Sequence, residues 1–255
     1  MLSSVTSGFI SRLRSNDQAA WFELWEIFGP VVRGQLAKWG KGRIGSETVR
    51  DLSQETLAAL SESIDRYDPA RGARFSTWLL AIAKHVLGDE MDRRSAQKRG
   101  GSKKAGEFDE SWMKAAAGAS ADEAYEAAVF RAKVEAAIRL VQKESDFTDF
   151  SIYRMRVLDG KPGKEVAEDL GISEPTVSRR LARVRDVLRA RLEQMILLYS
   201  FTEDERAEAA RNGLAKNPKT DPQRDDALFD EAIAEIYHRQ MELRRQDQAD
   251  RLSER

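Results

Sequence analysis

The sequence predicts an all-α protein made of two small helical domains, a flexible linker between them and a helical C-terminal extension. Apolar residues recur every three or four positions through most of the chain, which is the α-helical period. Only 6 of the 255 residues are proline, and no run alternates β-branched and polar residues as a strand would. Between residues 95 and 120 the composition shifts to Gly, Ser, Lys and Ala, which is typical of a linker.

The first predicted domain covers residues 1–96 and contains four helical stretches. Asp17 is placed to cap the first of them, and Gly29-Pro30 is expected to bend or break the helix before a second stretch begins. A third stretch carries an apolar stripe from Val49 to Ile64. The fourth begins after a turn at Asp68-Pro69. Its predicted inward face consists of Trp78, Leu79, Ile82, Val86, Leu87 and Met91.

The linker is assigned to residues 97–121 and the second domain to residues 122–200. Within the second domain, the segment KPGKEVAEDLG predicts a short helix that Gly171 closes, because glycine suits the left-handed position after a helix end. Ser173 is placed to cap the next helix, and Pro175 fits its first turn. Two helices joined by so short a turn form a helix-turn-helix, a unit that binds DNA.

In a helix-turn-helix, the N-terminal residues of the second helix contact base edges in the major groove. Serine and threonine bond to bases or phosphates, and arginine pairs with guanine through two hydrogen bonds. The alternative is an arginine-rich helix that water solvates at the surface of a bundle. The residues expected to bind DNA here are Ser173, Glu174, Thr176, Ser178, Arg179, Arg180 and Arg183.

A second candidate region spans residues 66–94, where basic and aromatic residues alternate. Single-stranded DNA binds to positive charge along its backbone and to aromatic side chains beside its bases. Phe75 and Trp78 stand at helical spacing, so we expect them in the core rather than against bases. His85 is expected on the polar side of its helix.

Several classes of function are not expected from the composition. The chain has no cysteine and only two histidines, so we predict no disulfide, no metal site and no cofactor. We expect no enzymatic activity, because no glycine-rich phosphate loop or nucleophile-base arrangement occurs. No basic region precedes an apolar core at the N-terminus, and no apolar run reaches about 18 residues, so we expect a cytoplasmic protein without membrane insertion.

The two candidate regions together resemble the sigma-70 family of RNA polymerase sigma factors, most closely its extracytoplasmic-function group. Residues 51–94 resemble region 2, with the acidic motif DLSQE, then FSTWL, and a following pattern in which His85 replaces an asparagine. Residues 166–185 resemble region 4 through VAEDLGISEPTVSRRLARVR. The matched segments come in the family order and are joined by a linker of the expected kind.

The resemblance implies a protein that binds core RNA polymerase and directs promoter recognition and transcription initiation. Region 4 would bind the minus-35 element as duplex and contact the β flap, while residues 66–94 would capture the melted minus-10 element. A regulator such as an anti-sigma factor is a further partner that the resemblance allows. The residues implied at the minus-10 element are Arg71, Arg74, Lys84, His85 and Arg93, and those implied at the β′ clamp helices are Asp51, Gln54, Glu55 and Glu62.

The extension, residues 201–255, is not part of the family pattern. From residue 203 onward it carries 14 acidic and 10 basic side chains and two predicted helices, the longer at 225–252. One hypothesis is that the acidic helix covers a basic DNA-binding face and inhibits the protein; a solvated helix or a contact with another protein is the alternative. For the chain as a whole, the rival interpretation is a stand-alone helix-turn-helix regulator, which would leave residues 51–94 unexplained.

Overall fold

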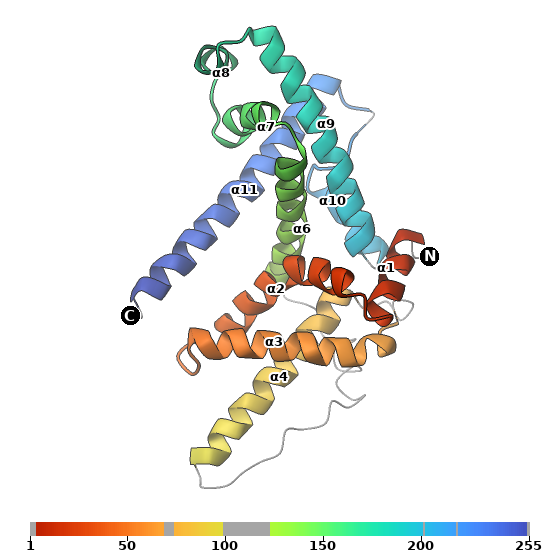
Figure 1. Cartoon of the computed structure of the whole chain (residues 1–255), viewed down its shortest axis with the longest axis vertical. Coiled ribbons are helices and arrows are strands. Elements are labelled where there is room, and N and C mark those ends of the chain that lie inside the picture. The colour runs from red at the N-terminus through yellow and green to blue at the C-terminus, as the bar shows by residue number, and fades with distance from the viewer. Residues whose placement is uncertain (1–3, 69–73, 99–122, 201, 218, 254–255) are drawn as a thin grey trace. The chain divides into compact units, whose positions relative to one another are not determined.

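The computed structural model describes residues 4–68, 74–98, 123–200, 202–217 and 219–253, and all regular elements within these ranges are helical (Figure 1). The predicted all-α class is therefore confirmed for the part of the chain that is described. Contacts divide the chain into two compact units, one of Met1–Ala132 with Ser200–Thr202 and one of Lys133–Tyr199 with Glu203–Arg255. The predicted linker lies almost wholly outside the described residues.

The first unit is built mainly from α1 (Ser4–Arg14), α2 (Gln18–Gly40), α3 (Ser46–Ser63), the short 3-10 turn η1 (Ile64–Arg66) and α4 (Phe75–Lys98). Asp17 caps α2 as predicted, since its Oδ1 accepts hydrogen bonds from the backbone N–H groups of Ala19 at 2.9 Å and Ala20 at 3.3 Å. Helix α1 was not predicted, although Phe9, Ile10 and Leu13 share one buried face of it.

Helix α2 passes through Gly29-Pro30 without ending, so the expectation of two separate helical stretches is wrong. Proline removes one backbone hydrogen bond from the helix interior. Leu24 and Phe28 before it and Val32 and Leu36 after it are nevertheless all buried on the same helix. Burial on both sides of the proline outweighs the lost bond.

An aromatic cluster lies between η1 and the first turn of α4. The rings of Tyr67 and Trp78 are stacked with their centroids 5.0 Å apart. The Phe75 ring makes edge-type contacts with the rings of Tyr67 and Phe28, at centroid distances of 5.3 and 5.4 Å. Phe75 is 1% and Trp78 4% exposed, so the prediction that both belong to the core is confirmed.

The second unit contains the helix-turn-helix and the extension. Its elements are α7 (Phe147–Tyr153), the wider π-type turn η3 (Arg154–Leu158), α8 (Gly163–Leu170), α9 (Glu174–Tyr199), α10 (Glu203–Arg211) and α11 (Pro222–Ser253). Helix α6 (Glu123–Glu144) contributes residues up to Ala132 to the first unit and the remainder to the second. Both helices predicted in the extension are present.

Among the helices that the structure describes, none combines the length and the apolar character needed to cross a membrane.

Candidate nucleic-acid interface

The turn between α8 and α9 has the conformation that its sequence predicts. Gly171 adopts φ 64° and ψ 32°, the left-handed region that a residue without Cβ enters at little cost. The N–H of Ile172 then donates to the carbonyl of Ala167 at 3.0 Å, which closes the end of α8. The carbonyl of Ser173 accepts from the N–H groups of Thr176 and Val177 and so starts α9. The predicted helix-turn-helix is present.

A small apolar core fixes the two helices of this motif against each other. Ile152 of α7, Val166 and Ala167 of α8, and Val177 of α9 are all buried in one cluster. Because Val177 is in the first turn of α9, the core holds the N-terminal end of that helix, the part expected to meet DNA.

The other face of the first turns of α9 is open to solvent and polar. Its exposed members are Ser173, Glu174, Ser178, Arg179 and Arg183, with Thr176 and Arg180 partly buried beside them. One terminal nitrogen of Arg179 donates to Thr176 Oγ1 at 3.3 Å, and the hydroxyls of Ser173 and Thr176 lie 2.9 Å apart. The structure thus brings all seven residues predicted to bind DNA onto one continuous stretch, but their surroundings differ.

Two of these arginines are held by a carboxylate that sequence reasoning missed. Asp149 of α7 accepts from Arg180 at 2.9 Å through one oxygen and from Arg183 at 3.2 Å through the other. The Asp149 side chain is only 8% exposed, whereas that of Arg183 is 70% exposed. Arg180 therefore contributes to the packing of α9 against α7. Arg179 has no such carboxylate partner among the described contacts. Asp149 lies 31 residues before Arg180, so no local pattern indicates the pair.

In the first unit, α3 presents a polar face formed by Asp51, Gln54, Glu55 and Glu62. All four side chains are exposed, while Leu52, Thr56 and Leu60 of the same helix are buried. The four residues implied at the polymerase therefore stand on the solvent side of α3.

The residues implied at the minus-10 element differ in their exposure to solvent. Lys84 and Arg93 are exposed, and Arg71 lies outside the described residues. His85 is 8% exposed, with Nε2 at 3.5 Å from an oxygen of Asp89, so the expectation that it faces solvent is wrong. Helix α4 packs against both α2 and α3, which buries a wider arc of it than one apolar stripe.

Glu90 organises the last turns of α4. It is 5% exposed and accepts hydrogen bonds from Arg93 and Arg94 together. Burial alone would raise the pKa of Glu90, but the hydrogen bonds from Arg94 and Arg93 outweigh it, so that the pKa lies below its usual value. Arg94 also donates to Thr48 Oγ1 at 2.9 Å. The spacing of three and four residues could have indicated this cluster from the sequence.

Arg74, just before α4, is held by Glu126 of α6. The carboxylate of Glu126 accepts from Arg74 at 2.8 Å and from the hydroxyl of Ser76 at 2.9 Å, so it occupies the N-terminal end of α4. The hydroxyl of Tyr125 donates to the carbonyl of Ser76 at 3.0 Å. Sequence reasoning did not find this contact, since about 50 residues separate its partners.

Within the described ranges, no three or more His, Asp or Glu side chains converge as metal ligands would.

Comparison with known proteins places two domains on these two regions. Residues 24–97 match the model for sigma-70 region 2, and residues 148–188 match a model for sigma-70 region 4. A 69-residue segment is 33% identical to the ECF RNA polymerase sigma factor RpoE of Cereibacter sphaeroides, covering 27% of this chain and 36% of that protein. The chain therefore spans about a third of the length of this curated relative.

Proposed function

With region 2 and region 4 domains in one chain, the protein belongs to the sigma-70 family, and we propose that it directs core RNA polymerase to promoters and helps to open them. It would act in the cytoplasm by binding alone, without catalysis or a cofactor. The observation that carries the proposal is the exposed polar stretch at the start of α9, set on a correctly formed helix-turn-helix turn.

For the minus-35 element, the surroundings of each side chain suggest a division of roles. Arg179 is exposed, and within the described part of the chain its side chain bonds only to a neighbouring hydroxyl, which suits a side chain that must reorient toward a base edge. Arg180 and Arg183 share Asp149, so their remaining N–H groups are better suited to phosphates, which position a protein without specifying sequence. Ser173, Glu174, Thr176 and Ser178 complete the proposed contact surface.

For the minus-10 element, we propose that exposed Lys84 and Arg93 contact the backbone of the melted strand, with Arg74 at the N-terminal end of α4. Arg71, which lies outside the described residues, is proposed as a further contact. Arg74 must exchange Glu126 for a phosphate to make its contact. His85 is buried, so its contribution to base preference would act through the position of Asp89 and the shape of α4 rather than through an open contact.

For polymerase docking, we propose that Asp51, Gln54, Glu55 and Glu62 on the exposed face of α3 contact the β′ clamp helices. Region 4 would contact the β flap. The helix dipole favours acidic residues in the first turn of a helix, and Asp51 and Glu55 lie beyond the first turn of α3, so the dipole gives them little stabilisation.

The test is transcription in vitro with purified core polymerase on genomic fragments, followed by mapping of the RNA 5′ ends. We expect discrete start sites that core polymerase alone does not use, and weaker initiation with Arg179→Ala. A co-purification with core polymerase separates this function from that of a stand-alone regulator, which should form no stoichiometric complex. The absence of any discrete start site, or of complex formation, would refute the proposal.

A further inference from the structure

The C-terminal extension packs into the second unit and completes its core. Phe229 is 1% and Ile233 is 0% exposed on α11, and Ala209 and Leu214 of the preceding segment are also buried. The π-type turn η3 is among the elements that α11 contacts. A solvated helix that did not pack against the rest of the unit would leave these side chains exposed.

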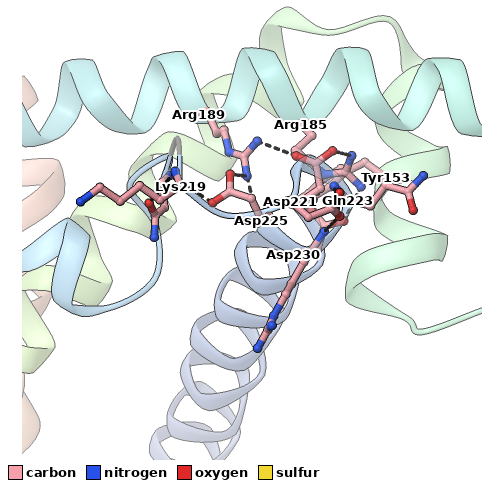
Figure 2. Close-up of polar contacts among 11 residues, drawn as sticks. Tyr153, Arg185, Arg189, Lys219, Asp221, Gln223, Asp225 and Asp230 are labelled. Carbon is pink, nitrogen blue, oxygen red and sulfur yellow. Dashed lines mark hydrogen bonds and ion pairs between the residues drawn. The ribbon is translucent and has the colours of Figure 1, made fainter.

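Two arginines of α9 reach the first turns of α11, as Figure 2 shows for Arg185 and Arg189. Arg185 binds both oxygens of Asp230, at 3.0 and 2.6 Å, and one oxygen of Asp226 at 2.8 Å. Parallel bonds from a guanidinium to one carboxylate are the most directional form of ion pair. Arg185 is thereby fixed in position as well as neutralised.

Arg189 is bound by Asp225 and Asp226, which lie one helical turn before Asp230 on α11. It lies 2.6 Å from an oxygen of Asp226 and 3.0 Å from Asp225. Its guanidinium also stands 4.5 Å from the centre of the Phe229 ring, within the range of a cation–π contact. The side chains of Arg185 and Arg189 are only 11% and 14% exposed, so solvent screens these pairs less than surface ion pairs.

The same acidic residues connect α11 to α7. The hydroxyl of Tyr153 lies 3.5 Å from Oδ1 of Asp230, and Tyr153 is fully buried. Tyr153 follows Asp149 by one helical turn on α7, and Asp149 holds Arg180 and Arg183. Helix α11 therefore braces α7 and α9 together, and these two helices carry the DNA-facing arginines and the carboxylate that holds them.

This clasp (Asp225, Asp226 and Asp230 with Arg185 and Arg189) lies away from the DNA-facing stretch. Arg185 is six residues beyond Arg179, which places it about 9 Å further along the helix and about 120° around its axis. Arg179 and Arg183 stay exposed with α11 in place. The acidic helix thus leaves these two side chains uncovered, while it does cover Arg185 and Arg189.

We propose that α11 is a positioning element for minus-35 recognition, in which Asp226 and Asp230 hold α9 in the orientation that presents Arg179 to base edges. This inference depends on the proposed function. Neutralising the clasp should then weaken sequence-specific binding, whereas removing an inhibitory cover should strengthen it.

The experiment compares holoenzymes made with full-length wild type and with the Asp226→Asn/Asp230→Asn double variant. The probes are two DNA fragments from a promoter mapped by the start-site experiment, one with its native minus-35 element and one with that element scrambled. For the double variant we expect the ratio of the two affinities to fall about fivefold or more, the effect of losing one well-placed base contact. A purely structural role would lower the melting temperature but leave this ratio unchanged.

Matched variants keep the result interpretable. Glu235→Gln/Glu242→Gln removes the same charge from exposed positions of α11 and should leave the ratio unchanged, and Asp230→Glu retains the carboxylate and should restore most of it. Should the double variant not fold, the single Asp230→Asn variant takes its place. A ratio that is unchanged or higher in the folded Asp variants overturns the inference. If wild-type holoenzyme does not distinguish the two fragments, the proposed function fails instead.

Discussion

Alanine substitutions of two neighbouring arginines of α9, Arg179 and Arg180, should affect stability and DNA binding differently. Arg179→Ala removes an exposed side chain with one hydrogen bond to a hydroxyl, so the free energy of unfolding should change by no more than about 0.5 kcal/mol. Arg180→Ala removes a partner of Asp149, whose side chain is 8% exposed. A hydrogen bond to a charged group contributes about 1.5–3 kcal/mol. Because Arg180 is 36% exposed and Arg183 still binds Asp149, we expect Arg180→Ala to lower the free energy of unfolding by about 1 kcal/mol.

For sequence-specific DNA binding the order should be reversed, with Arg179→Ala having the larger effect. If Arg179 binds a guanine through two hydrogen bonds, its loss weakens binding to the cognate minus-35 element by about 1–3 kcal/mol, and much less to a scrambled one. Arg180→Ala should weaken binding to both sequences alike, as loss of a phosphate contact does.

The assays are urea unfolding monitored by circular dichroism and holoenzyme titrations on the two fragments. Arg191→Ala serves as a control on the same helix, because Arg191 pairs with Glu144 through a partly exposed bridge. The reasoning is refuted if Arg180→Ala leaves stability intact while abolishing discrimination between the fragments, since Arg180 would then be the base-contacting arginine.

Three further predictions concern other parts of the chain. Phe229→Ala should lower the free energy of unfolding of the second unit by about 3–5 kcal/mol in urea titrations, because the ring is 1% exposed; a loss below 1 kcal/mol would mean that α11 is not docked in solution. Glu126→Gln should tighten binding of a single-stranded minus-10 oligonucleotide by freeing Arg74, with exposed Glu123→Gln as the control, and equal affinities would contradict this role. Burial raises the pKa of Tyr125 and Tyr153 above 10, so the unfolded chain loses these protons first and stability should fall as the pH rises past about 10; ultraviolet titration that shows both phenols ionising before unfolding would refute this.

The helix-turn-helix was predictable because its determinants are local. Gly171 needs only its own left-handed backbone, and Pro175 only the first turn of the next helix. The docking of the extension was not predictable in the same way, since Arg185 and Asp230 are 45 residues apart and acidic side chains in a helical stripe fit many partners equally well. The burial of His85 was missed because a single helix pattern does not show that two neighbouring helices pack on α4.

The difference between local signals and long-range contacts also explains why α2 is continuous. Proline is a local signal against a helix interior, and by itself it predicts a break. The buried residues that flank Pro30 act through contacts with other helices, so their effect becomes visible only when the whole unit is assembled.

The carboxylate shared by Arg180 and Arg183 has a thermodynamic consequence for binding. An unbound arginine samples many rotamers, and ordering one such side chain at an interface costs about 0.5–1.5 kcal/mol. Asp149 restricts both side chains before any DNA arrives, so that part of this entropy is lost on folding instead. An Asp149→Asn variant should therefore bind promoter DNA with a less favourable entropy in calorimetry, even if every contact in the final complex is re-formed.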